Sequence, residues 1–343
     1  MINLRNIWSV AAYELKTLFR SWFFRIFAII ALLFLFGINM GLFGSQSEAN
    51  WTYRAIASNI PYINILLINV AMAIIAIFLA SEFLKRDRKL DTTEVIYARP
   101  ISNGEYVTGK TTGIIMLFIG LVMATLLMAL IFNLIKSDTP VIWQAYILYP
   151  LLISLPTLLF ILGLSFFLMI LLRSQAVTFL ILLGYIGLTL FYFKDKLNGL
   201  LDYMAFNLPM IYSDFIQFAD IQNILLHRLA YLFLGIGFIF GTIRFLGRLP
   251  QTGRLNFINL AGCILFIIAG VFLGYRYLDD YNEKNDNRKR YLALNDAYAS
   301  YPAGDIIAND ISVVQKGASL ICSSSMVVSG IMLAMTGRSV TWP

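Results

Sequence analysis

Seven long apolar stretches constrain the fold of this chain more than any other feature of its sequence. Each has about the 20 residues that a helix needs to cross the roughly 30 Å hydrocarbon core of a bilayer. They are Trp22–Phe43, Tyr62–Phe83, Thr112–Ile135, Tyr146–Leu172, Ala176–Phe193, Leu225–Phe245 and Phe257–Tyr277. The chain is 59% hydrophobic and 13% charged, whereas a soluble domain is about half apolar and a quarter charged. The sequence therefore predicts an all-α membrane protein.

The residues before the first stretch form an amphipathic pattern. One helical face would carry only apolar side chains, and the other residues of the segment include charged ones. The apolar positions are Leu4, Ile7, Trp8, Ala11, Leu15 and Leu18, and the charged positions are Arg5, Glu14, Lys16 and Arg20. Such a pattern is typical of a helix that lies along the membrane surface with basic residues toward the headgroups. We predict an interfacial helix over residues 1–21.

The distribution of Lys and Arg predicts the orientation of the chain. Loops on the same side as the N-terminus hold 13 basic residues, and the opposite short loops hold 5. Basic residues mark cytoplasmic loops, so we expect the N-terminus in the cytoplasm and the tail 278–343 outside. The net charge of +7 fits this rule, and we expect no nucleic acid partner.

The tail leaves two interpretations open. Ile311–Val314 and Ser319–Val328 read as strands of a small exposed domain. Residues 317–337 carry no charge, so they could instead form an eighth span, although five serines and three glycines weaken that alternative. The sequence lacks a closing strand pattern, so we expect the exposed domain to be incomplete.

Gly104–Thr111 (GEYVTGKT) matches the phosphate-loop pattern G-x-x-x-x-G-K-[ST] letter for letter. A working phosphate loop needs a buried strand before it, a helix after it and a second strand with a magnesium-binding acid. Here the turn sequence ARPISN precedes the match and an apolar span follows it. We interpret the match as accidental, with Gly109 and Lys110 ending a loop and anchoring the third span at the headgroups.

Few residues in this chain could carry chemistry. The single histidine, His227, excludes a multi-histidine metal site, and Cys263 and Cys322 form no CxxC pair. We expect His227 and Arg228 to lie at the outer interface, where the sixth span begins. Pro156 is expected to kink the fourth span and to expose a carbonyl to a cavity or neighbouring helix. Five asparagines are expected mainly to pack across helices: Asn39, Asn64, Asn69, Asn133 and Asn259. The sequence predicts no catalytic residue, metal or cofactor, and no ion relay, so an external motor is expected.

The loop between the second and third spans carries the most specific pattern. It reads SEFLKRDRKLDTTEVIYARPISNGEYVTGK from Ser81 to Lys110, and it resembles the type-2 ABC exporter permeases. In that comparison Glu82 matches the acid at the end of span two, and Thr93–Ala98 matches a short coupling helix. Arg99–Ser102 matches the turn after it, although Asp91-Thr92-Thr93 stands where the family usually has a Gly-Thr pair. The resemblance implies these ATPase-coupling residues: Glu82, Thr93, Glu94, Val95, Ile96, Tyr97, Arg99 and Pro100. The alternative is a solvated loop whose basic residues only follow the positive-inside rule.

The resemblance also implies the organisation of the chain. It implies an N-terminal interfacial helix, a six-span bundle over 22–245, a coupling loop at 82–110 and an outer segment at 195–224. A cytoplasmic loop and seventh span follow over 246–277, and then the extracytoplasmic tail. The seventh span and tail are similar to a Bacteroidota-like subgroup that carries an external zinc-aminopeptidase-like domain, but this chain has neither a second bundle nor a zinc motif. It would be a fragment or a short relative of that subgroup.

The function implied by the resemblance is that of a multi-pass permease subunit in the bacterial inner membrane. It would export a substrate while a separate cassette ATPase hydrolyses ATP, and it would form a homodimer or pair with a second permease. The chain itself would not be an enzyme. A membrane-anchored assembly or sensor protein that transports nothing is the alternative.

Overall fold

The computed structural model describes residues 3–43, 56–89, 101–136, 140–213, 215–247, 253–299, 305–316, 319–329 and 340–341. The chain divides into two compact units. The first consists of Met1–Ile211 and Asp220–Asp279, and the second of Tyr212–Ala219 and Asp280–Pro343.

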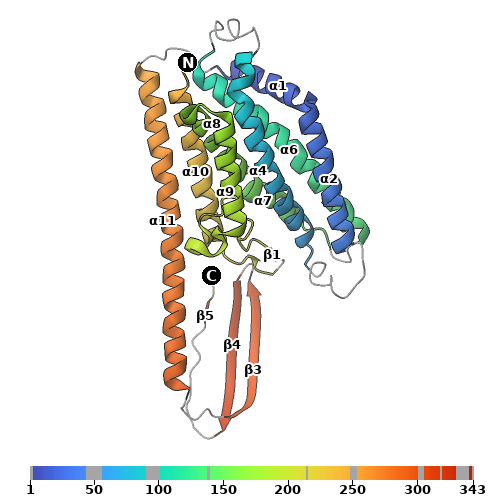
Figure 1. The fold of residues 1–343 in the computed structure, drawn as a ribbon. Helices are drawn as coiled ribbons and strands as arrows, with labels where there is room; N and C mark the ends of the chain where they lie inside the picture. Colours follow the sequence, from blue (N-terminus) through green and yellow to red (C-terminus); the bar gives the residue numbers. More distant parts are fainter. Residues whose placement is uncertain are drawn as a thin grey trace. The chain divides into compact units, whose positions relative to one another are not determined.

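The first unit is a bundle of helices (Figure 1). Its helices are α1 (Leu4–Arg20), α2 (Trp22–Phe43), α4 (Asn59–Lys89), α6 (Asn103–Lys136), α7 (Trp143–Tyr149), the π-helix η2 (Pro150–Ser154), α8 (Leu155–Leu172), α9 (Gln175–Phe191), the 3-10 helix η3 (Phe193–Gly199), α10 (Ile221–Phe245) and the first part of α11 (Gly253–Tyr298). Within the described residues, six helical segments are long and apolar enough to cross a membrane. Each of them contains all or most of one of the seven predicted spans. The remaining predicted span is α9, whose 17 residues are at the lower limit of that length.

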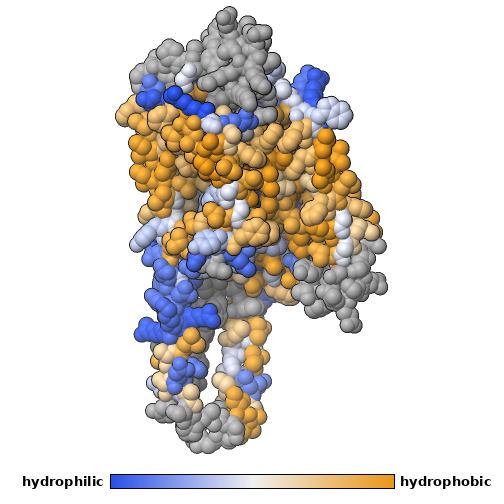
Figure 2. Space-filling model, in the orientation of Figure 1, coloured by the Kyte–Doolittle hydropathy of each residue, from blue (hydrophilic) through white to orange (hydrophobic). Residues whose placement is uncertain are grey.

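The surface of the bundle matches the membrane prediction. Figure 2 shows a continuous hydrophobic band over the helices of the first unit. Large apolar side chains on α2 are exposed, among them Ile29, Ile30 and Leu33 at 58%, 60% and 64%. Such a contiguous apolar surface would cause a soluble monomer to associate, but it is the expected outer surface of a bundle in lipid.

Helix α1 begins where the Asn3 side chain accepts a hydrogen bond from the Arg5 backbone N–H, which is a typical N-cap. It is inclined to the longer helices (Figure 1) and ends at Ser21, where the chain turns into α2. The predicted interfacial helix is therefore present as a helix. Its buried residues, however, include Glu14, which the amphipathic pattern had assigned to the polar positions.

Helix α1 packs closely against α6 because α6 has glycine at the contact. A Cβ atom at Gly109 would lie 2.7 Å from Val10 Cβ, and one at Gly113 would lie 2.7 Å from the Ala11 carbonyl oxygen. Neither space can hold a side chain without moving the backbone of α1. The pair thus acts as a small-xxx-small motif of the kind that lets membrane helices approach.

The second unit contains five strands in its described residues and the remainder of α11. β1 (Tyr212–Ser213) pairs with β2 (Gln217–Phe218), and β3 (Asp305–Lys316) pairs antiparallel with β4 (Ser319–Ser329), which also pairs with β5 (Val340–Thr341). The two predicted tail strands fall within β3 and β4, so residues 319–329 are strand rather than part of an eighth span. Helix α11 continues to Tyr298, well beyond the predicted seventh span. An i,i+4 ion pair of 2.7 Å between Lys284 and Asp280 supports that part of the helix.

Candidate functional site

The predicted coupling loop leaves the bundle at the end of α4 and returns to it at the start of α6. Glu82 lies in α4. The other predicted coupling residues, Thr93–Pro100, lie outside the described residues. The structure therefore describes the helices that carry the loop, and the geometry of its return point into α6 is well defined.

A capping box starts α6 directly after the loop. Ser102 Oγ accepts a hydrogen bond of 3.2 Å from the Glu105 backbone N–H, and Glu105 Oε2 accepts one of 2.9 Å from the Ser102 backbone N–H. These reciprocal bonds satisfy two backbone donors that a helix start otherwise leaves free. The loop therefore ends at a fixed point, two residues after Pro100.

The Glu105 carboxylate also holds the start of α1. Its Oε1 atom accepts a hydrogen bond of 2.6 Å from the Asn3 backbone N–H, and Oε2 accepts one of 3.4 Å from Asn6 Nδ2. The neighbouring residue Asn103 donates from Nδ2 to the Leu246 carbonyl at 2.9 Å, at the end of α10. Glu105 and Asn103, both in the first turn of α6, thus connect α6 to the start of α1 and to the end of α10. We call this cluster, formed by Asn3, Ser102, Asn103, Glu105 and Leu246, the junction.

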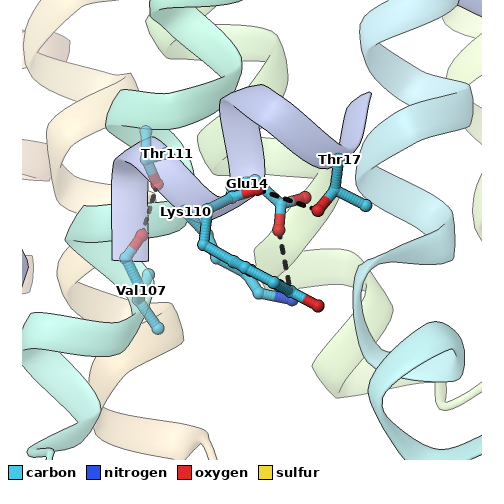
Figure 3. A network of polar contacts seen from close by, with 6 residues as sticks. Glu14, Thr17, Val107, Lys110 and Thr111 are labelled. Carbon is cyan, nitrogen blue, oxygen red and sulfur yellow. Dashed lines mark hydrogen bonds and ion pairs between the residues drawn. The ribbon is translucent and has the colours of Figure 1, made fainter. Parts of the chain in front are cut away.

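One turn further along α6, a buried ion pair reinforces the contact with α1. Lys110 Nζ lies 3.7 Å from Glu14 Oε2, and both side chains are almost fully buried, at 4% and 3% exposure. Figure 3 shows the two side chains pointing toward each other from the two helices. The Lys110 ammonium also lies 5.0 Å from the centre of the Tyr106 ring. The pair explains why Glu14 can be buried in an interfacial helix.

The phosphate-loop match lies in this same part of α6 and is helical. Residues Gly104–Thr111 lie inside α6, which begins at Asn103 rather than at the predicted Thr112. Thr111 donates its hydroxyl hydrogen to the Val107 carbonyl within the helix at 2.8 Å (Figure 3). A phosphate loop needs free backbone N–H groups around the phosphate, and a helix interior does not offer them. The predicted role of Gly109 and Lys110 as the end of a loop is wrong, because both residues pack α6 against α1.

Changing Lys110 to methionine is expected to destabilise the bundle while leaving nucleotide binding absent. The substitution removes Lys110 from a buried ion pair with Glu14, at an expected cost of about 3–5 kcal/mol. Thermal unfolding of the purified chain in detergent would measure the loss, and Glu14→Gln combined with Lys110→Met should recover part of it. Saturable ATP binding that disappears in Lys110→Met would contradict the helical interpretation of the motif.

Near the start of α10, the buried side chain of Arg228 donates a hydrogen bond to a carbonyl whose usual helical donor is missing because of Pro156. In a regular α-helix the Leu152 carbonyl would accept from the backbone N–H of residue 156, and Pro156 has none. Arg228 Nε, from α10, donates to that carbonyl at 2.7 Å, and Arg228 Nη2 donates to the Ile153 carbonyl at 2.8 Å. The prediction that Pro156 would expose a carbonyl to a neighbouring helix is confirmed. The π-helix η2 immediately before Pro156 marks the same irregularity.

Arg228 also fixes the segment that precedes α10. Its Nη1 donates to the Tyr203 carbonyl at 2.9 Å, and its Nη2 also donates to Thr157 Oγ1 at 2.8 Å. From α4, Asn69 Nδ2 donates to the Met204 carbonyl at 2.9 Å and to Thr157 Oγ1 at 3.2 Å. These contacts join α4, α8, α10 and residues 203–204 into one polar core, which we call the arginine core.

His227 and Arg228 are buried inside the protein, at 0% and 1% exposure. Their expected place at the outer membrane interface stays a prediction. His227 Nε2 lies 3.3 Å from the Gly199 carbonyl oxygen, and the ring lies between those of Tyr231 and Tyr277, at 5.2 Å from each. The physical reason for this burial is that residues 199–208 fold into the bundle and provide carbonyl acceptors for these two side chains.

Other polar residues join helices as expected. Asn39 and Asn64 exchange side-chain hydrogen bonds of 2.7 and 2.8 Å between α2 and α4. Asn133 Nδ2 donates to the Tyr146 hydroxyl at 3.3 Å between α6 and α7. Asp202, in the segment before α10, accepts from the Asn207 backbone N–H at 2.7 Å. Burial raises the pKa of the Asp202 carboxyl, and backbone hydrogen bonds from Asn207 and Phe206 partly oppose that rise, followed by the nearby positive charge of Arg228.

Comparison with known protein families agrees with this architecture. The ABC-2 family of transporter proteins matches residues 8–280, which is most of the chain and includes all of the helices of the first unit except the first four residues of α1. The chain belongs to this family, as a multi-span membrane component. No curated protein matches the chain. Membrane components of this family typically lack ATPase activity themselves, in agreement with the helical structure of the phosphate-loop match.

Proposed function

We propose that this protein is the permease subunit of an ATP-driven exporter and that a separate cassette ATPase moves it. The observation that carries the proposal is the junction. Through its hydrogen bonds, a movement of the loop before α6 would be transmitted to α6, α1 and α10. A loop that ends at Ser102 pulls directly on α6, and Glu105 and Asn103 pass the displacement to α1 and α10. Family membership supports the pairing, since ABC-2 permeases generally pair with a cassette ATPase.

In the proposed mechanism, the ATPase docks on residues 93–100, and Glu82 and Arg99 hold the angle of the loop. Closure of two ATPase subunits around ATP then tilts α4 and α6 as rigid bodies. The Glu14–Lys110 pair and the glycine contact would make α1 move together with α6. The arginine core, two turns into the opposite end of α10, would keep α8 and α10 together during that movement.

We also propose a membrane topology, an assembly and an external domain for this chain. The N-terminus would lie in the cytoplasm of a bacterium, residues 278–343 would lie outside, and two permease chains would assemble around the pathway. Similarity to the subgroup with an external zinc-aminopeptidase-like domain would make β3 and β4 part of a larger external domain.

Reconstitution with a cassette ATPase tests the proposal. The gene beside that of this chain is the first candidate, if it encodes a true phosphate loop and an LSGGQ-like signature. We expect the two proteins to co-purify from membranes, and we expect the ATPase rate in liposomes to change when the permease is present. A stable complex whose ATPase rate is unaffected by the permease under all substrates tried would favour the assembly or sensor function instead.

A further inference from the structure

A groove of about 590 Å³ lies between α1, α2 and α6. Its lining is apolar apart from Lys16, which contributes from α1 beside Phe19. From α2 the lining extends from Phe24 to Leu32, a rise of about 12 Å along the helix. The groove therefore starts at the interfacial helix and runs along two membrane-spanning helices.

Small residues keep this groove open. A Cβ atom added at Gly120 of α6 would meet nothing within 4 Å, in contrast to Gly109 and Gly113 on the same helix, where it would clash with α1. Ala28 and Ala124 also line the groove. Glycine and alanine here leave a space between helices rather than closing it. In a bilayer an apolar space that faces the lipid is filled by hydrocarbon chains.

The open end of the groove is positively charged. Lys16 is exposed, and among the residues that the structure describes its ammonium has no carboxylate partner. Arg20 lies one turn further along α1 and is also exposed. By contrast, the buried Lys110 on α6 is paired with Glu14. An exposed ammonium beside an apolar groove is complementary to a phosphate headgroup.

We infer that the groove between α1, α2 and α6 binds one anionic phospholipid, with an acyl chain along Phe24–Leu32 and Gly120 and the headgroup phosphate at Lys16. The lipid belongs to the leaflet on which α1 lies. It fills the side of α1 that α6 leaves uncovered and thereby supports the angle between α1 and α2. This inference does not depend on transport or on an ATPase partner.

Native mass spectrometry of the full chain, titrated with phosphatidylglycerol or with phosphatidylcholine of the same acyl chains, tests the inference. We expect one tightly bound lipid per chain and a preference for phosphatidylglycerol of about fivefold, the effect of one basic residue near a membrane surface. Lys16→Gln should remove that preference without weakening phosphatidylcholine binding, and Lys16→Arg should keep it. Gly120→Leu should reduce the binding of both lipids, because the new side chain occupies the groove.

Gly184→Leu is the matched control, because Gly184 in α9 is also exposed and has nothing within 4 Å of an added Cβ. It should leave lipid retention unchanged. Equal retention by Gly120→Leu and Gly184→Leu would mean that only unspecific annular lipid is bound, and the inference would be overturned. It would also be overturned if Lys16→Gln kept the preference, or if Gly120→Leu dissociated a dimer without changing lipid retention, since a second copy would then occupy the groove.

Discussion

Arg228→Met is expected to lower the free energy of unfolding of the bundle by about 3–5 kcal/mol, because several buried acceptors lose their donor at about 1–3 kcal/mol each. The methionine keeps much of the side-chain volume but none of the donors. Leu152 and Ile153 would lose the donors that Arg228 supplies, and Leu152 cannot regain one from its own helix because residue 156 is proline. Thermal unfolding in detergent, with the ratio of folded to aggregated protein after purification, measures the effect.

The proline provides a direct test of this explanation. Pro156→Ala supplies a backbone N–H at the position that a regular α-helix would pair with the Leu152 carbonyl. Arg228→Met should therefore cost about 1–2 kcal/mol less in the Pro156→Ala background than in the wild type, the value of one buried acceptor regaining its donor. Additive effects of the two substitutions would contradict the assigned role of Arg228.

A control substitution separates the loss of a buried network from the loss of a positive charge. Arg20 is exposed on α1, so Arg20→Met should change the free energy of unfolding by no more than about 0.5 kcal/mol. Arg228→Lys is expected to fall between the wild type and Arg228→Met. The lysine ammonium is a point donor and cannot reproduce the planar fork with which Arg228 reaches four acceptors.

The helices were predictable from sequence because hydrophobic length alone determines which segments can span a bilayer. The start of α6 was not predicted by that criterion, since residues 103–111 are too polar to extend an apolar stretch. The local signal was nevertheless present: Ser102 and Glu105 stand three apart, which is the spacing of a capping box. A helix start at residue 103 would have shown that the phosphate-loop match is helical.

The buried charges were harder to predict, because their partners are distant in sequence. Nothing in the periodicity of α1 identifies Lys110 as the partner of Glu14. Arg228 had a clearer signal, since a proline in one span creates an acceptor that some other helix must satisfy. Pro156 predicts the exposed carbonyl, as the structure confirms, but it does not predict which side chain donates to it. The predicted interfacial position of His227 and Arg228 followed from their place near the end of an apolar stretch, which does not reveal that residues 199–208 cover them.

Glu82→Ala and Arg99→Ala are each expected to abolish the substrate-dependent stimulation of a reconstituted cassette ATPase, while the bundle remains folded. Glu82 lies in the α4 helix that leads into the loop, and Arg99 lies three residues before Ser102, where α6 is fixed by its capping box. Loss of either side chain is expected to leave the ATPase bound but to let the loop change its angle when the ATPase closes. The movement would then no longer reach α6, α1 and α10 through the junction.

Lys89→Ala is the matched control for this experiment, because it removes a charge from the same loop region without a proposed coupling role. It should leave substrate-dependent stimulation near the wild-type value, and all three variants should unfold at similar temperatures. Basal ATPase activity should be retained in each, since we propose that hydrolysis occurs in the partner. Unchanged stimulation in both Glu82→Ala and Arg99→Ala would reject the coupling assignment, and equal loss in Lys89→Ala would favour a solvated loop in which only the total positive charge matters. Loss of stimulation confined to Glu82→Ala and Arg99→Ala would instead support a rigid loop that transmits ATPase closure through Ser102 and Glu105 to the rest of the bundle.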